Sequence, residues 1–205
     1  MRLEVIKSEQ KKIFEKLKNF KEYYLAGGTA LAFQIGHRIS VDFDFFSPKD
    51  IPKCLLSKIK RLFKEYKVKV EVNNPEQLTV TLNEVHLTFL KYPFPIILKL
   101  VKHQGVKMLS IPEIAATKAY TIGHQATLKD YVDLYFILKE KHTTLERIIN
   151  LAQKKFKNEF NTRLFLEQLI YLEDIEDIEI EYLKEKPTKA QIQKFFEKEV
   201  SKLKI

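Results

Sequence analysis

The stretch that most constrains the fold runs from Leu25 to Phe46 and reads LAGGTALAFQIGHRISVDFDFF. Its apolar pattern and paired glycines predict a strand, a short helix and a second strand from Ile39 to Phe46. Asp42 and Asp44 lie two residues apart on that second strand, so both carboxylates point to one face, with Cα atoms roughly 7 Å apart. Apolar residues beside them fill the opposite face. The segment therefore predicts a carboxylate pair close to a glycine turn.

The two carboxylates indicate a cation site. Close carboxylates disfavour each other's ionised forms, and burying them without partners costs free energy. A divalent cation between them removes this conflict. Mg²⁺ suits the pair because it takes one or two protein carboxylates and leaves its other positions to phosphates and water. An edge strand with its polar face in water is the alternative interpretation.

Gly27, Gly28 and Thr29 form the turn that precedes the helix. Backbone amides at such a turn can bind phosphate oxygens, because they point outward at the start of the helix. Plain turn chemistry is the alternative, since glycine pairs commonly mark turns. The turn followed by the carboxylate pair is more specific than either feature alone, and together they outline a site for a metal-bound nucleotide.

Three motifs in this sequence resemble those of the AbiEii/AbiGii-type nucleotidyltransferases, toxins of bacterial toxin–antitoxin and phage-defence pairs in the DNA polymerase β-like superfamily. The glycine turn matches the family's glycine motif. Residues 36–46, GHRISVDFDFF, match its G-H-R-x-S-x-D-x-D-F-F strand motif. Lys118 and residues 129–134, KDYVDL, match a helix lysine and an R/K-D-x-x-D-L element. The resemblance covers roughly residues 20–140, with the motifs in the family's order.

The resemblance implies transfer of a nucleoside monophosphate from an NTP to an acceptor, with release of pyrophosphate. It implies one or two Mg²⁺ ions held by Asp42 and Asp44. The implied nucleotide-binding residues are Gly27, Gly28, Thr29, Arg38, Ser40 and Lys118. The implied catalytic residues are Asp42, Asp44, Lys118, Asp130 and Asp133. Arg38 has an alternative role, in which it pairs with a carboxylate.

The later motif has structural as well as chemical interpretations. Lys118 lies on the apolar stripe of a predicted helix, where lysine is seldom buried without a partner, although a snorkelling side chain also fits. Asp130 occupies the third helical position after Thr127, where a carboxylate completes a capping box. Asp133 follows one turn later and can pair with Lys129 or Lys118, or orient Lys118 toward a nucleotide.

One feature departs from the superfamily pattern, in which a third carboxylate often follows the carboxylate-pair strand. The corresponding strand here is Val85–Leu90, VHLTFL, which contains none. Thr88 occupies the face where the carboxylate is expected. The general base and a second metal therefore stay unassigned, and the spacing of Glu71 and Glu84 does not mark either as a substitute.

The pattern of elements predicts an α/β (α+β) fold with a mixed sheet. We expect a nucleotidyltransferase core over residues 1–109 and a helical region over 110–205 that completes the active site. The sheet is expected to end at the Tyr92–Pro95 segment, YPFP. Capping boxes are expected at Ser110 and at Thr127, each followed three residues later by an acidic side chain.

The formal net charge of the 205 residues is +9. A basic balance favours polyanionic partners such as nucleic acid, although a lysine-rich genome or a thermophilic source gives the same balance. Residues 173–181, EDIEDIEIE, are acidic and are expected to form a solvated segment. The expected partners are an NTP, an RNA or tRNA acceptor and, from the resemblance, an antitoxin protein.

The sequence also argues against membrane and secreted classes. No apolar run approaches the length needed to span a bilayer, and the N-terminus lacks the apolar core of a signal peptide. Cys54 is the only cysteine and cannot form an internal disulfide. These features fit the cytoplasm. Three functions remain: an RNA- or tRNA-directed nucleotidyltransferase toxin, an enzyme that modifies a protein hydroxyl, or a catalytically weak NTP-binding partner module.

Overall fold

A seven-stranded mixed sheet organises the N-terminal half of the chain in the computed structural model, which describes residues 2–203. The strands are β1 (Tyr24–Leu25), β2 (Phe43–Ser47), β3 (Val68–Asn73), β4 (Gln77–Leu82), β5 (Val85–Lys91), β6 (Val101–His103) and β7 (Val106–Met108). They lie in the order β3-β4-β5-β2-β1-β7-β6. The pairs β1–β7 and β2–β5 are parallel, and the other neighbours are antiparallel. The predicted α/β fold with a mixed sheet is confirmed.

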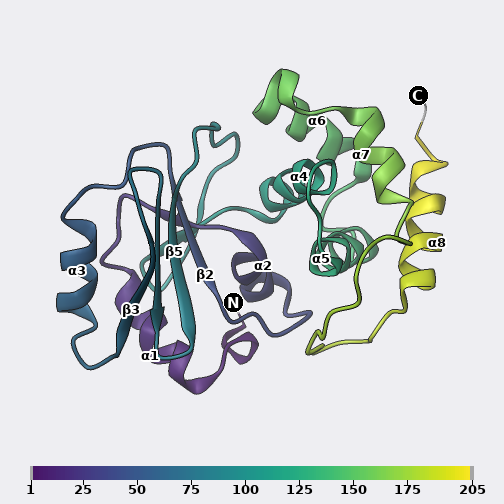
Figure 1. Cartoon of the computed structure of the whole chain (residues 1–205). Helices are drawn as coiled ribbons and strands as arrows, with labels where there is room; N and C mark the ends of the chain where they lie inside the picture. The colour runs from purple at the N-terminus through teal and green to yellow at the C-terminus, as the bar shows by residue number, and fades with distance from the viewer. Residues whose placement is uncertain (1, 204–205) are drawn as a thin grey trace.

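The helices divide between the two halves of the chain. They are α1 (Ser8–Leu17), α2 (Gly27–Ile35), α3 (Leu55–Leu62), α4 (Ile111–Ile122), α5 (Leu128–Lys139), α6 (Leu145–Phe156), α7 (Thr162–Leu169) and α8 (Lys189–Val200). In Figure 1 the helices α4 to α8 form a group beside the sheet, with α2 between the two. Short 3₁₀ turns occupy Leu3–Val5 and Lys157–Glu159. The division into two domains at residue 109 stays a prediction, although the described strands all precede that residue.

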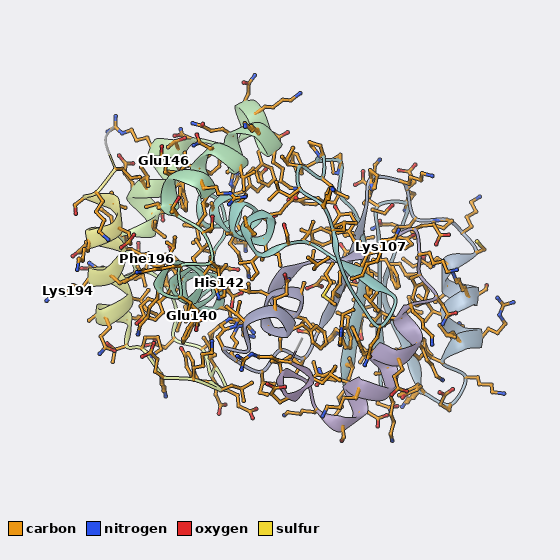
Figure 2. All side chains as sticks on the ribbon, turned by 180° about the vertical axis from the view of Figure 1, so that it is seen from behind. Lys107, Glu140, His142, Glu146, Lys194 and Phe196 are labelled. Atoms are coloured by element: carbon orange, nitrogen blue, oxygen red, sulfur yellow. The ribbon has the colours of Figure 1, made fainter. Side chains whose placement is uncertain are left out.

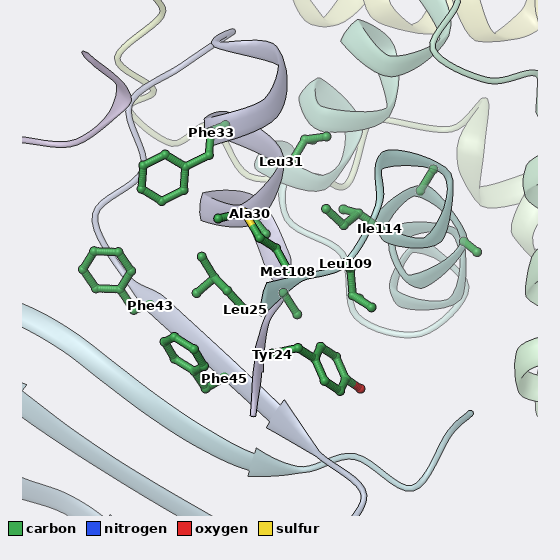
Figure 3. Packing of buried hydrophobic residues seen from close by; sticks show 14 of the residues in the cluster. Tyr24, Leu25, Ala30, Leu31, Phe33, Phe43, Phe45, Met108, Leu109 and Ile114 are labelled. Carbon is green, nitrogen blue, oxygen red and sulfur yellow. The ribbon is translucent and has the colours of Figure 1, made fainter. Parts of the chain in front are cut away.

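Helix α2 is buried on nearly every side. Its residues Ala30, Leu31, Ala32 and Phe33 have no exposed surface, as expected of an apolar helix inside a core. Figure 3 shows Ala30, Leu31 and Phe33 of this helix beside strand residues such as Leu25, with Ile114 of α4 close by. The packing holds the first turn of α2 in a fixed place against the sheet.

Strand β2 is shorter than the sequence predicts. We expected it to begin at Ile39, but it begins at Phe43. Residues 37–39 leave the sheet because they pair with residues 181–183: the Ile39 amide donates to the Glu181 carbonyl (2.8 Å), and the Leu183 amide donates to the His37 carbonyl (3.0 Å). Residues 181–183 therefore form hydrogen bonds with the backbone groups that would otherwise have extended β2.

The sheet also continues further than expected. The segment at Tyr92–Pro95 does not end it, because β6 and β7 form an antiparallel hairpin and β7 pairs with β1. Gln104 and Gly105 connect the hairpin with φ values of +47° and +83°, which is the backbone of a tight two-residue turn. Strands of three residues carry little periodicity, so no sequence pattern predicted this hairpin.

The prediction of a capping box at Ser110 is wrong. Ser110 precedes α4, but its hydroxyl makes no capping hydrogen bond. The Glu113 carboxylate instead accepts the amides of Ile97 and Leu98 at 2.9 and 2.8 Å and the Lys155 ammonium at 2.9 Å. Glu113 and Lys155 are both buried. Lys155 of α6 therefore binds the Glu113 side chain that would otherwise have completed the capping box.

Candidate active site

The carboxylate pair lies directly beside the glycine turn. Asp42 precedes β2 and Asp44 lies within it, and both are half-buried. The Ala26 amide donates to the Asp44 carbonyl at 2.8 Å. Gly27 adopts φ +66°, and a Cβ added there would lie 3.1 Å from Asp44 Oδ2. The first turn of α2 and the Asp44 carboxylate are therefore neighbours, as the spacing of the two motifs predicts.

The two carboxylates do not share the same electrostatic environment. Burial and the neighbouring Asp42 carboxylate together raise the pKa of Asp44 to about 6, while the charges of Lys118 and His86 oppose the rise. One oxygen of Asp42, Oδ1, is buried and has no hydrogen-bond partner within residues 2–203. Two acidic groups that are partly desolvated and short of donors form a site that favours a cation.

This donor set fits one magnesium ion. No group of three or more histidine, cysteine or acidic side chains that could hold a metal occurs within residues 2–203. Mg²⁺ commonly binds through one or two carboxylates and takes its remaining ligands from substrate phosphates and water. Asp42 and Asp44 supply the one or two carboxylates that such an ion takes from a protein.

Thr29 supports the backbone on which Asp42 lies. Its hydroxyl lies 2.7 Å from the Ser40 hydroxyl and donates to the Asp42 carbonyl. Gln10 of α1 donates its side-chain amide to the carbonyls of Ser40 and Val41. The side chains of Thr29 and Ser40 are thus committed to the approach to β2. The backbone amide of Thr29 belongs to the first turn of α2, where amides have no intrahelical acceptor.

Arg38 lies behind the glycine turn. Its Nε and Nη2 donate to the two oxygens of Asp133 at 2.8 and 3.0 Å, and the residue is only 3% exposed. A Cβ added at Gly28 would lie 2.2 Å from Arg38 Nη2. The absence of a side chain at Gly28 is therefore what admits the guanidinium. The structure contains the carboxylate pairing, and a direct contact between Arg38 and phosphate stays a prediction.

Asp133 is the centre of a buried charge cluster. Besides Arg38 it accepts from Lys118 Nζ at 2.8 Å and from His37 Nε2 at 2.7 Å. Burial by itself would raise the pKa of Asp133, but Arg38 and Lys118 hold it well below its usual value. Burial lowers the pKa of His37, which favours the neutral form of this imidazole. His37 is part of the matched motif, but the sequence alone gave it no role.

Lys118 is paired rather than snorkelling. Its ammonium lies 2.6 Å from Asp130 Oδ1 and 2.8 Å from Asp133 Oδ2. Burial would lower the pKa of Lys118, yet attraction to Asp133 and Asp130 raises it. Asp130 also accepts the amide and hydroxyl of Thr127 through Oδ2. Both interpretations of Asp130 are therefore present at once, since it caps α5 and binds the lysine. Asp133 pairs with Lys118 and not with Lys129.

The strand beside β2 carries no carboxylate on the same face. Thr88 of β5 is in direct register with Asp44, so a hydroxyl stands where the resemblance leads us to expect an acid. Glu71 lies two strands away on β3 and accepts from Thr81 at 3.1 Å. Glu84 lies in the turn between β4 and β5. Neither glutamate is on β5, and the departure from the superfamily pattern stands.

A groove elsewhere on the molecule has no predicted site residue in its lining. Its volume is about 920 Å³, and it lies between α6, α7 and the end of α8, with Glu146, Leu166 and Leu203 among its walls. Figure 2 labels Glu146 on the side of the molecule remote from Lys107.

Comparisons with known proteins agree with this geometry. The family model described as the nucleotidyl transferase AbiEii toxin of type IV toxin–antitoxin systems matches residues 13–79 and 67–204. An uncharacterised protein of Aquifex aeolicus is 28% identical over 200 residues, which cover 95% of this chain and 96% of that protein.

Two solved structures from Helicobacter pylori share the fold. JHP933 has a TM-score of 0.54 and 16% identity, covering 96% of this chain and 97% of its own. A candidate nucleotidyltransferase has a TM-score of 0.53 and 20% identity, covering 78% of this chain and 80% of its own.

Within residues 2–203, no helix has the length and apolar character needed to cross a bilayer. The chain belongs to the AbiEii nucleotidyl transferase toxin family, and the predicted enzyme class, nucleotidyltransferase, is confirmed.

Proposed function

We propose that this nucleotidyltransferase transfers a nucleoside monophosphate from an NTP to an RNA acceptor, with tRNA the expected class, in a Mg²⁺-dependent reaction that releases pyrophosphate. An antitoxin protein would restrain it in the cell, in keeping with the type IV toxin–antitoxin family. The observation that carries the proposal is the position of the Asp44 carboxylate against Gly27 and of the Asp42 backbone against Thr29, at the first turn of α2 and next to the charge cluster centred on Asp133.

Asp42 and Asp44 would hold the metal. A bound Mg²⁺ neutralises charge that develops on the phosphates and helps to align the attacking and leaving oxygens. The first-turn amides of α2, from Gly27 to Thr29, point outward without intrahelical acceptors and would bind oxygens of the triphosphate. The protein side of the site is preorganised, because α2 is buried and β2 is paired on both edges.

Lys118 keeps one donor for the nucleotide. A lysine ammonium has three N–H groups, and the two ion pairs with Asp130 and Asp133 use two of them. The third can donate to a phosphate oxygen without breaking either pair. Arg38 and Asp133 then contribute indirectly, because they fix the position of Lys118. We propose Lys118 as the phosphate contact, and Asp130 and Asp133 as the residues that position it.

The RNA acceptor is supported by charge. The whole chain carries a formal net charge of +9, and residues 173–181 are acidic, so the remaining surface is more basic than this total. Affinity for a polyanion should then fall steeply with salt, by about 0.7–0.9 log units per phosphate contact for each tenfold rise. A protein acceptor would not require that dependence.

The test is to incubate the protein with each α-labelled NTP and with tRNA, total RNA or bacterial protein, using Asp42→Ala as the blank. Label on RNA that requires both Mg²⁺ and Asp42 supports the proposal. Label on protein alone would transfer the function to a protein-modifying enzyme. NTP binding without any transfer would favour the weak partner module, for which the absence of a carboxylate on β5 is the relevant observation.

A further inference from the structure

The face of the sheet that carries Asp44 also carries a histidine. On β5, Val85, Leu87 and Phe89 are buried, so His86 and Thr88 point to the opposite face. That face is shared with Asp44, because Asp44 is in register with Thr88. The strands β2 and β5 are parallel and pair from Phe43 with Leu87 onward, so His86 lies directly before the paired stretch and two residues from Thr88. The imidazole therefore lies on the same face of the sheet as Asp44.

His86 is held by neighbours on the adjacent strands. Thr81 of β4 is in register with it, and the Thr81 hydroxyl lies 3.3 Å from His86 Nδ1. The same hydroxyl donates to Glu71 Oε1 on β3 at 3.1 Å. Lys69 Nζ lies 2.9 Å from the same Glu71 oxygen, Oε1. Three neighbouring strands thus contribute a linked row of polar side chains that ends at His86.

The protons in this row assign the tautomer of the imidazole. A threonine hydroxyl has one hydrogen, and here it goes to Glu71, because a carboxylate can only accept. Thr81 must then accept from His86, so Nδ1 carries the hydrogen of the neutral ring. The other nitrogen, Nε2, is left with a free lone pair on an exposed side chain. Fixing one ring nitrogen in this way is how proteins prepare the other as a base.

We infer that His86 Nε2 accepts the proton of the acceptor hydroxyl during nucleotidyl transfer. In this step the hydroxyl oxygen forms a bond to the α-phosphorus of the NTP, the bond from that phosphorus to the bridging oxygen breaks, and pyrophosphate leaves. The hydroxyl proton passes to Nε2, and the imidazolium later returns it to water. The inference rests on the proposed function, because it assigns the base for that reaction.

Other groups on this face are less suited to the task. Glu71 is occupied by Lys69 and Thr81, and Asp42 and Asp44 would be bound to the cation. Thr88 is a poor base at neutral pH. A protonated His86 also lowers the pKa of Asp44, so the imidazole is within electrostatic reach of the carboxylates. His86 therefore occupies the role that a third carboxylate would otherwise fill.

Two variants at this position and one elsewhere test the role. His86→Ala removes the base, His86→Gln keeps a polar side chain that cannot take the proton, and His142→Ala removes an exposed histidine that pairs with Glu140 at the end of α5. Positioned acid–base groups contribute about 100- to 10,000-fold. We expect kcat to fall by about 100-fold or more in both His86 variants and to be unchanged in His142→Ala. NTP affinity measured by calorimetry should stay within about twofold in all three.

Two further readouts separate a base from a structural side chain. Added imidazole should restore part of the lost kcat in His86→Ala but not in His86→Gln, because only the smaller side chain leaves space for it. Long-range proton–nitrogen NMR spectra of the free protein should show His86 as the Nδ1–H tautomer, and Thr81→Val should remove that preference. This second measurement does not require turnover.

The outcomes distinguish the inference from the function on which it rests. Full kcat in His86→Ala, together with inactivity of Asp42→Ala, would overturn the inference and leave the proposed function intact. An Nε2–H tautomer in the wild-type protein would also overturn it. If the wild-type protein labels no acceptor, the proposed function fails, and the inference fails with it because no hydroxyl proton is transferred.

Discussion

The guanidinium of Arg38 forms a two-point ion pair with Asp133, with distances of 2.8 and 3.0 Å, directly behind the glycine turn that opens α2. This pair joins three parts of the chain that are distant in sequence: the turn, the segment leading to β2, and α5. Gly28 belongs to the glycine motif, Arg38 to the strand motif and Asp133 to the later helix motif. The pair therefore explains why the turn, the carboxylates and the lysine are fixed relative to one another.

Gly28→Ala should destabilise the protein. The added Cβ would lie 2.2 Å from Arg38 Nη2, and the guanidinium cannot retreat without losing Asp133. Overpacking of this kind costs about 1–3 kcal/mol, which denaturant unfolding at neutral pH would measure. Gly123→Ala is the matched control, because its Cβ would meet nothing closer than 3.6 Å. Equal stability of the two variants would show that Arg38 is not confined.

Asp133→Asn should be among the most damaging changes in the chain. It leaves Arg38 and Lys118 buried with one ionised partner fewer, and breaking a buried pair costs about 3–5 kcal/mol. The exposed Asp177, which pairs with Lys189, provides a control in Asp177→Asn, whose unfolding free energy should change by less than about 0.5 kcal/mol.

The same residue should make the protein acid-sensitive. The pKa of Asp133 in the folded protein is well below its ordinary value of 3.8, so its contribution to stability is complete above that value and is lost as the pH falls below it. The stability difference between wild type and Asp133→Asn should therefore shrink below about pH 4. A constant difference from pH 7 to pH 3 would contradict this assignment.

Much of the local structure followed from patterns within single segments. The strand expected over Val85–Leu90 is present as β5 and is one residue longer at its end, and the capping box expected at Thr127 opens α5. The sequence also predicted that the glycine turn and Asp44 lie close together, because a short helix returns the chain to an adjacent strand. These are features that local sequence periodicity determines.

The features that the sequence missed depend on contacts between distant segments. The pairing of residues 37–39 with residues 181–183 shortens β2, and Lys155 of α6 takes Glu113 from its capping box. The Asp133 cluster likewise joins Arg38 to a residue 95 positions later. Local propensity does not encode which distant partner a polar group will find. The alternatives considered therefore included the pairing of Lys118 with Asp133 and of Arg38 with a carboxylate, but they did not identify that carboxylate as Asp133.

Asp44→Asn should stabilise the metal-free protein at neutral pH. The pKa of Asp44 is raised to about 6 in the folded state, so stability that the neutral carboxyl provides at low pH is lost as the pH rises from about 4 to about 6. At pH 7 the variant should be more stable than wild type by about 1–3 kcal/mol, and the difference should close near pH 4.

Magnesium should act in the opposite direction on the same pair. A cation held by Asp42 and Asp44 binds the folded state, so Mg²⁺ should raise the melting temperature of the wild-type protein. It should have little effect on Asp44→Asn. Melting curves with and without Mg²⁺ test this, and an equal Mg²⁺ response in the two proteins would place the metal elsewhere.

Lys118→Ala should weaken NTP binding, whereas Lys129→Ala should not. Both variants remove one positive charge near the start of α5, but Lys118 is buried against Asp130 and Asp133 while Lys129 is exposed. A charge-assisted hydrogen bond to phosphate contributes about 1.5–3 kcal/mol, so the dissociation constant should rise by about 10- to 100-fold. Calorimetry at a temperature where circular dichroism shows both variants folded makes the comparison independent of stability. An unchanged constant for Lys118→Ala would mean that all of its donors serve the Asp133 cluster, and phosphate binding would then depend on the α2 amides and the metal alone.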